Sequence, residues 1–170
     1  MTIGLLSDTH GYLDPTIMEH FKDCDEIWHA GDIGDAEVVD ELEKHKPLQA
    51  VFGNIDDPVL RARFKEDIHL MRGGLSIWMT HIGGRPPHFN TRINKLLKEN
   101  KPQVFICGHS HVLLVKRDEK SNLLCINPGA AGHHGFHSMR TIIRMEIKDA
   151  KVVKMEVIEL GKRGVNSVMS

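Results

Sequence analysis

The sequence predicts an α/β protein in which two β-sheets pack face to face and helices cover their outer faces. The first half of the chain alternates strand-like and helix-like segments, which is typical of parallel strands joined by crossover helices. After residue 102 the strand-like segments follow one another directly, which favours antiparallel pairing. Two stacked sheets with helices outside would satisfy both halves of the chain.

In the first half, short apolar runs that end at a polar or glycine turn predict strands at residues 3–6, 26–30 and 48–52. Helices are predicted where a capping residue precedes an amphipathic segment. Asp14 and Pro15 begin one helix, and residues 35–45 form the second. Asp57 and Pro58 open a further helical turn that extends to residue 63.

In the second half, residues 67–71 and 75–80 flank two glycines and predict a β-hairpin. A Gly/Pro-rich loop at 83–87 precedes a helix at 90–98. Further strands are predicted at 103–107, 112–116, 123–126, 141–147 and 152–160. We expect a single domain over residues 1–160 and a C-terminal tail at 161–170, because the strand pattern ends there.

Composition restricts the classes of function. The 170 residues carry a net charge of -1, which argues against a stable nucleic-acid partner or an anionic membrane surface. The three cysteines are far apart and form no CxxC motif, as in reduced structural residues. The apolar run at residues 3–6 is too short for a signal peptide or a membrane span, so we expect a cytoplasmic protein. The 12 histidines are unusually many and are consistent with metal binding.

A potential metal ligand follows each of five predicted strands. In open α/β sheets, sites form at the carboxyl ends of strands, so these side chains are expected to converge at one edge. Seven nitrogen and oxygen ligands at one edge would suffice for two divalent cations. They are Asp8, His10, Asp32, Asn54, His81, His109 and His111.

The motifs DTH, GD, GN, TH and GHSH occur in this order, and the sequence thereby resembles the calcineurin-like metallophosphoesterases. Its length and spacing are similar to the small single-domain phosphodiesterases of the YfcE type. The turn Asn127-Pro128-Gly129 matches a late turn of that family. The resemblance implies a four-layer α/β/β/α sandwich of two mixed β-sheets flanked by helices, with a two-metal site between the strand ends.

The resemblance also implies a role for each ligand. Asp32 would bridge the two cations, and catalytic roles fall to Asp32, Asn54 and His109. A water caught between two cations ionises near neutral pH, and the resulting hydroxide would attack a phosphodiester. Mn²⁺ is the expected metal, with Zn²⁺, Fe²⁺, Ni²⁺ or Mg²⁺ as alternatives. The first cation would be held by Asp8, His10, Asp32 and His111, and the second by Asp32, Asn54, His81 and His109.

Ile55 stands where many larger relatives carry a histidine that can protonate the leaving group. Asp56 would need a raised pKa to replace it, so substrates with acidic leaving groups should react best. The partner would be a small phosphate ester, and a homodimer is plausible at this size. Alternatives are a phosphomonoesterase with the same site and a non-catalytic interaction scaffold. For the histidines of residues 133–137 we expect a solvated loop or a dimer surface, with a pocket edge as the alternative.

Overall fold

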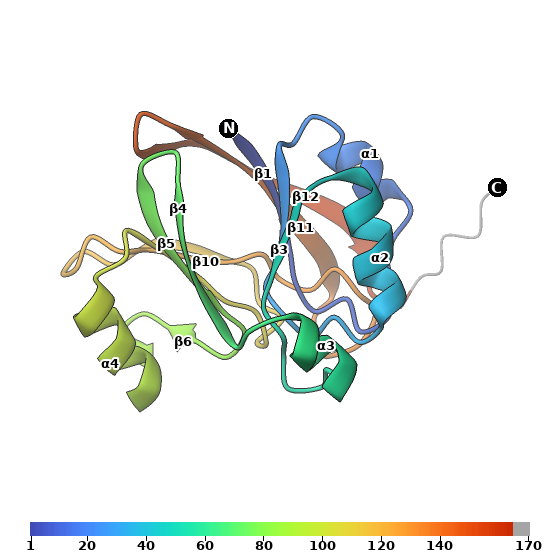
Figure 1. The fold of residues 1–170 in the computed structure, drawn as a ribbon, viewed down its shortest axis with the longest axis horizontal. Helices are drawn as coiled ribbons and strands as arrows, with labels where there is room; N and C mark the ends of the chain where they lie inside the picture. The colour runs from blue at the N-terminus through green and yellow to red at the C-terminus, as the bar shows by residue number, and fades with distance from the viewer. Residues whose placement is uncertain (165–170) are drawn as a thin grey trace.

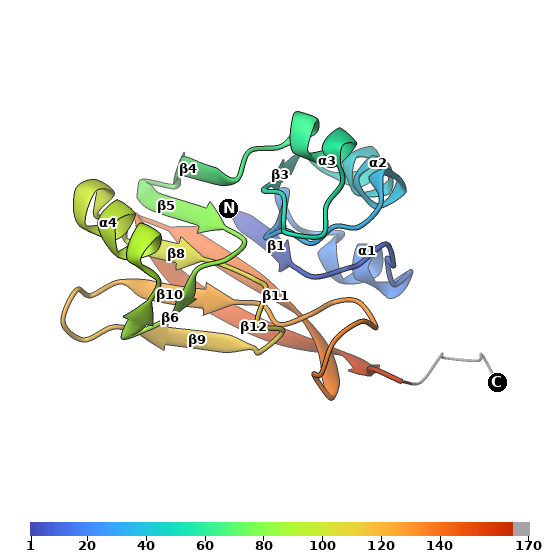
Figure 2. The same ribbon diagram turned by 90° about the horizontal axis from the view of Figure 1, so that it is seen from below.

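The structure is a computed structural model that describes residues 1–164. Two five-stranded sheets lie face to face, and helices cover their outer faces (Figures 1 and 2). Each sheet contains both parallel and antiparallel neighbours. The predicted four-layer α/β/β/α sandwich of mixed sheets is therefore confirmed.

The first sheet has the strand order β12-β11-β1-β2-β3. The parallel strands β1, β2 and β3 are joined through the helices α1 and α2, as the alternating pattern predicts. The long hairpin of β11 and β12 extends the sheet on the antiparallel side of β1. The bounds are β1 (Thr2–Leu6), α1 (Thr16–Phe21), β2 (Glu26–His29), α2 (Ala36–His45), β3 (Leu48–Ala50), β11 (Met139–Lys148) and β12 (Lys151–Lys162).

The second sheet has the order β4-β5-β8-β10-β9 and differs from the antiparallel meander expected for this half of the chain. Strand β8 pairs in parallel with both β5 and β10. The reason is that α4 crosses over between β5 and β8, and the chain then returns through β9 before it enters β10. The bounds are β4 (Asp67–Arg72), β5 (Leu75–Thr80), α4 (Thr91–Asn100), β8 (Val104–Ile106), β9 (Leu114–Arg117) and β10 (Leu124–Asn127).

Three smaller features complete the chain. The predicted helical turn is α3 (Pro58–Arg63), and the loop predicted at 83–87 contributes β6 (Gly84–Arg85), which pairs with β7 (His88–Phe89). Strand β12 extends two residues into the predicted tail, because its last residue still pairs with the start of β11. The rest of that tail from residue 165 lies outside the described residues. No helix in residues 1–164 is long and apolar enough to cross a membrane.

The alternation of side chains along the strands separates three apolar clusters. Ile3 and Leu5 point between the sheets, where they pack with Ile77 and Ile106, while Leu6 faces the helices of the first sheet. A smaller cluster under α4 covers the outer face of the second sheet. Truncating one of these buried side chains to alanine costs about 2–5 kcal/mol. The clusters therefore fix the sheet edge from which the loops with the predicted ligands project.

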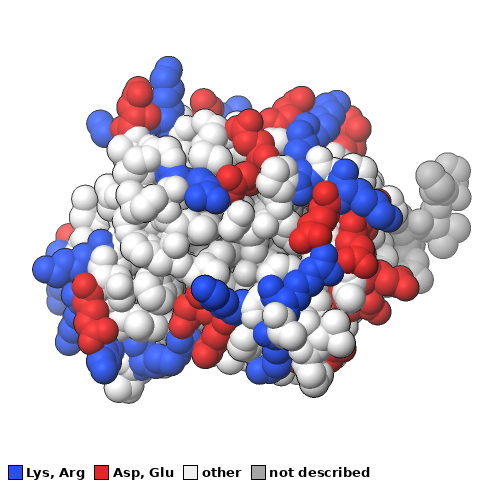
Figure 3. Space-filling view, in the orientation of Figure 1, with Lys and Arg blue, Asp and Glu red and all other residues white. Residues whose placement is uncertain are grey.

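The structure shows where the cysteines and the charged side chains lie. Cys24, Cys107 and Cys125 are free and buried, as the sequence predicts. Burial raises the pKa of the Cys107 and Cys125 thiols to about 12, so both remain protonated at neutral pH. Acidic and basic side chains are mixed over the face shown in Figure 3.

Candidate metal centre

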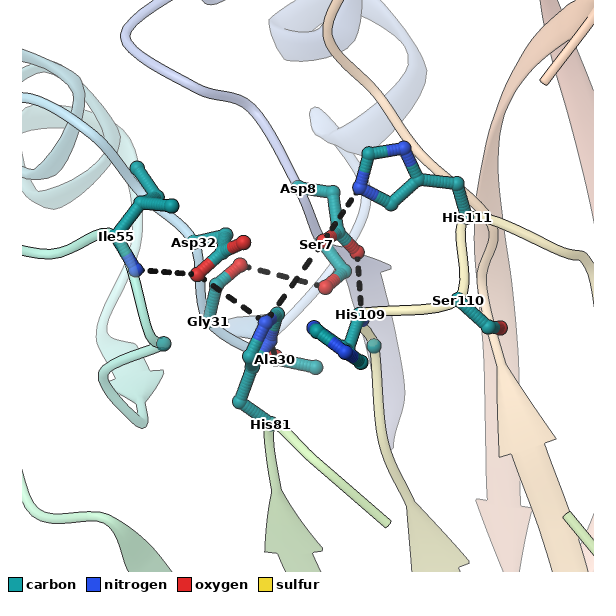
Figure 4. A network of polar contacts seen from close by, with 12 residues as sticks. Ser7, Asp8, Ala30, Gly31, Asp32, Ile55, His81, His109, Ser110 and His111 are labelled. Atoms are coloured by element: carbon teal, nitrogen blue, oxygen red, sulfur yellow. Dashed lines mark hydrogen bonds and ion pairs between the residues drawn. The ribbon is translucent and has the colours of Figure 1, made fainter. Parts of the chain in front are cut away.

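Six of the seven predicted ligands form two clusters at the carboxyl ends of β1, β2, β5 and β8. Within each cluster the ligand atoms lie within 4.8 Å of one another. In Figure 4 the side chains of Asp8, Asp32, His81, His109 and His111 lie close together. The first cluster is Asp8, His10 and His111, and the second is Asp32, His81 and His109. Their convergence agrees with the sequence pattern, and their role as ligands remains a prediction.

Asp32 lies between the two clusters. Its Oδ1 is 3.1 Å from Nε2 of His81, in the second cluster. Its Oδ2 is 3.7 Å from Nε2 of His10, in the first cluster. One carboxylate thus faces both groups, which is the position expected of a bridging ligand.

Asp8 supplies the test of whether the site fits a cation. Its side chain is fully buried, and Oδ1 lies 3.1 Å from Nε2 of His111 and 4.0 Å from Nε2 of His81. Neither Asp8 Oδ1 nor His81 Nε2 makes a hydrogen bond in the described residues. An unsatisfied buried polar group costs about 1–3 kcal/mol. A cation bound at each cluster would satisfy these atoms, Asp8 Oδ1 in the first and His81 Nε2 in the second, so the residues present fit a metal.

Five of the predicted ligands have a left-handed backbone conformation, which residues other than glycine rarely adopt. Such conformations cost of order 1–3 kcal/mol each and cluster at functional sites. Backbone hydrogen bonds between neighbouring loops hold them in place, from Asp8 N to Gly31 O at 3.0 Å and from His10 N to Asp32 O at 3.1 Å. The φ angles are 55° at Asp8, 48° at His10, 51° at Asp32, 66° at His109 and 57° at His111.

His29 ties the loops after β1 and β2 together. The N–H of Gly31 donates to Nδ1 of His29 at 3.1 Å, so the ring proton lies on Nε2, which donates to the Thr9 hydroxyl at 2.9 Å. Thr9 in turn donates to the carbonyl of Ile33. Burial lowers the pKa of His29 to about 4, so the ring is neutral. The sequence pattern gives His29 no partner, and its position two residues before Gly31 is the signal that could have indicated this link.

Two further side chains brace the remaining loops. The Asn127 amide donates to the carbonyl of Gly108 at 2.8 Å and so fixes the loop that carries His109. Both carboxylate oxygens of Asp56 accept backbone N–H groups at 2.7 Å, from Gly34 and from Gly53. Asp56 is therefore committed to holding the loops and is not available to protonate a leaving group.

The electrostatics differ among the predicted ligands: they favour the ionised form of Asp32 and the neutral form of His10, as a cation requires, but the protonated form of His81. Burial opposes a charge on His81, but Asp32 and Asp8 outweigh it and raise its pKa above the ordinary value. Burial likewise opposes ionisation of Asp32, but His81 and other partners lower its pKa. For His10, burial outweighs the carboxylates and lowers the pKa, so the ring is neutral at pH 7. The second nitrogen of His81, Nδ1, donates to the carbonyl of Ala30 at 2.8 Å, which aims Nε2 at the site.

Asn54, the seventh predicted ligand, lies in the loop after β3. It lines a cavity together with His81. The next residue, Ile55, donates its backbone N–H to Asp32 Oδ1 at 3.1 Å, which holds this loop against the second cluster.

The histidine loop of residues 132–137 lies against the first cluster. The ring of His134 is 4.6 Å from that of His10, and the ring of His137 is 5.3 Å from that of His111. His134 is exposed and His133 and His137 are half-buried, so the loop is partly solvated, as expected, and also borders the first cluster, as the pocket-edge alternative predicts. The dimer surface stays a prediction.

A backbone contact explains why this loop reaches the cluster. The N–H of Gly132 donates to the carbonyl of Asp8 at 3.0 Å. A Cβ at Gly132 would lie only 2.3 Å from the carbonyl oxygen of Thr9, so a glycine permits this close approach.

Two facing mixed sheets with paired histidine–carboxylate clusters at a shared edge define an α/β protein with candidate metal-ligand groups. A comparison with protein-family models matches residues 1–150 to the calcineurin-like phosphoesterase superfamily domain. The chain belongs to this family, as its motifs predict.

Individual relatives agree with this assignment. The chain is 30% identical over 165 residues to a protein of Methanocaldococcus jannaschii named probable metallophosphoesterase, covering 94% of this chain and 82% of the relative. Its fold is similar to that of an archaeal phosphodiesterase, with a TM-score of 0.76 and 24% identity over 94% of this chain and 100% of the other. It is also similar to Vps29 from Entamoeba histolytica complexed with Zn²⁺, with a TM-score of 0.70 and 16% identity over 96% and 100% of the two chains. The two structural likenesses show the fold alone.

Proposed function

We propose that this protein is a metal-dependent hydrolase of small phosphate esters, with phosphodiesters as its preferred substrates. The observation that carries the proposal is Asp32, whose carboxylate oxygens face His81 in one cluster and His10 in the other. Membership of the calcineurin-like phosphoesterase family supports the class of reaction.

The residues present would hold two cations. Mixed imidazole, carboxylate and amide ligands suit Mn²⁺, Fe²⁺, Zn²⁺ or Ni²⁺ better than Ca²⁺ but do not choose among them. We propose Mn²⁺, with the other three or Mg²⁺ as alternatives. When bound, two such cations supply the Lewis acidity that ionises a water molecule and balances the charge of the phosphate. One cation would be held by Asp8, His10, Asp32 and His111, and the other by Asp32, Asn54, His81 and His109.

The chain's own residues shape the chemistry in two ways. Asp8 and Asp32 are the two carboxylates of the predicted ligand set, so they leave a divalent pair with net positive charge, and neutral Asn54 does not reduce it. This charge attracts a phosphate ester. Ile55 has no proton to give, and both oxygens of Asp56 accept backbone N–H groups. Esters whose leaving group is already acidic should therefore react fastest.

The test compares bis(p-nitrophenyl) phosphate with p-nitrophenyl phosphate, each with the metal-free protein and with each cation added in turn. We expect the higher kcat/KM on the diester with Mn²⁺, and bound metal by elemental analysis. Dominant turnover of the monoester would favour a phosphomonoesterase with the same site. No turnover with any cation would reject hydrolysis in favour of an interaction scaffold, which the likeness to Vps29 makes worth testing.

A further inference from the structure

Arg61, on α3, has a guanidinium whose orientation is fixed by the loop that carries Asn54. Its Nε donates to the carbonyl of Asp56 at 2.7 Å. Its Nη2 donates to the carbonyls of Gly53 at 3.1 Å and Asn54 at 3.0 Å. The ring of Phe52 lies against the guanidinium, 4.6 Å from Cζ. A side chain held in this way loses little conformational freedom when it binds a ligand.

The charge of Arg61 is not compensated by a carboxylate. Carbonyl oxygens orient a guanidinium but carry no net charge. In the described part of the chain Arg61 forms no ion pair, whereas Arg63 pairs with Asp40 at 2.7 Å and Arg92 pairs with Asp67. The two N–H groups on Nη1 of Arg61 also make no hydrogen bond within residues 1–164. Arg61 therefore presents an oriented cation whose Nη1 donors can bind a ligand.

This cation lines a cavity of about 220 Å³ beside the second cluster. The cavity is also lined by Asn54 and His81, both predicted ligands, and by Phe52 and Ile82. The Glu66 carboxylate also lines the cavity and lies 3.3 Å from Nη2 of Arg92, which pairs with Asp67 as well, so Arg92 offsets only part of the charge of Glu66. An anionic group that entered the cavity would meet Arg61 next to the predicted ligands.

We propose that Arg61 binds a second anionic group of the substrate in this cavity, so that the enzyme selects phosphodiesters whose non-leaving alcohol carries a negative charge. This choice of substrate rests on the phosphodiesterase activity proposed above. A charge-assisted hydrogen bond to a solvent-accessible arginine is worth about a tenfold effect on kcat/KM. Because the effect depends on the charge of the substrate, it differs from a purely structural role in holding the loop.

The test uses three p-nitrophenyl phosphodiesters that share one leaving group. The second alcohol is methanol, choline or 3-hydroxypropanoate, which makes the tail neutral, cationic or anionic. We expect the wild type to prefer the anionic tail, and Arg61→Met to lose about tenfold more in kcat/KM on that diester than on the other two. Arg61→Lys should keep part of the preference, because it keeps the charge. Arg63→Met, on the same helix, is the matched control and should behave as wild type.

An equal loss on all three diesters would overturn the proposal and leave Arg61 as a loop brace. Should Arg61→Met fail to fold, Arg61→Gln removes the charge while it keeps amide donors for the carbonyls. Should the wild type hydrolyse none of the esters, the proposed function fails, and calorimetry with pyrophosphate then decides the role of Arg61. Weaker pyrophosphate binding by the neutral variant, with unchanged Mn²⁺ content, would support an anion site, and equal binding would refute it.

Discussion

Replacing Asp32 by asparagine removes one charge at the point where the two clusters meet and preserves the size of the side chain. Asp32 is 2% exposed, and its Oδ1 accepts the N–H of Ile55 at 3.1 Å, a hydrogen bond that an amide oxygen can also accept. We therefore expect D32N to fold, with its metal-free form nearly as stable as the metal-free wild type. It should lose cation binding and, with it, hydrolysis.

The size of the effect follows from the distances in the site. His81 Nε2 lies 3.1 Å from Asp32 Oδ1. We take this distance as the separation between a bound positive charge and the Asp32 carboxylate. At an effective dielectric constant of about 20, a unit positive charge at this separation is stabilised by about 5 kcal/mol. Each factor of ten in affinity corresponds to about 1.4 kcal/mol. Even if solvation offsets half of this energy, Mn²⁺ affinity should fall by roughly a hundredfold.

Calorimetric titration of Mn²⁺ into the metal-free proteins measures this change, and turnover of bis(p-nitrophenyl) phosphate at saturating Mn²⁺ measures its consequence. Asp40→Asn is the matched control, because Asp40 lies on α2 and pairs with Arg63 at the surface. If D32N bound Mn²⁺ as tightly as the control, or hydrolysed the diester at a similar rate, the bridging position of Asp32 would be refuted.

Three further changes test the supports of the site. Asp14→Asn leaves buried Arg140 without its partner at 2.7 Å and should cost about 3–5 kcal/mol in urea unfolding at pH 7. Burial opposes ionisation of Asp14, but hydrogen bonds and Arg140 lower its pKa; this stabilisation is thus present above about pH 4 and lost as pH falls through the lowered pKa. Gly53→Ala would place a Cβ 2.0 Å from Asp32 Oδ1 and should weaken Mn²⁺ binding in calorimetry. Removing metal with EDTA should lower the Tm in thermal scans and added Mn²⁺ should restore it, because a cation satisfies the unpaired buried atoms.

Each of these expectations has its own contrary result. For Asp14→Asn, a loss of stability toward acid pH identical to that of the wild type would show that the ion pair contributes nothing in that range. For Gly53→Ala the matched control is Gly164→Ala, whose added Cβ meets nothing within 4 Å, and equal Mn²⁺ affinity of the two variants would contradict the steric argument. A Tm that does not respond to EDTA would speak against a stabilising cation.

The strands and helices were predictable because their signals are local. Apolar alternation and capping residues such as Asp35 and Asp57 lie within a few positions of the elements that they define. The parallel direction of β8 was not predictable in this way. It depends on α4 crossing the second sheet and on β10 lying beside β8, which no short window of sequence contains.

By itself, the sequence determined which residues stand at the ends of strands, and hence the predicted ligands and the family. Only the tertiary structure decided how those residues are grouped. Asp8 meets His111 and Asp32 meets His81 because sheet order brings distant loops together. The hydrogen bonds by which His29 and Arg61 hold loops also depend on tertiary structure, because each needs its loop partners in place. A turn depends on residues that are neighbours in the sequence, whereas contacts between distant loops depend on how two whole sheets pack.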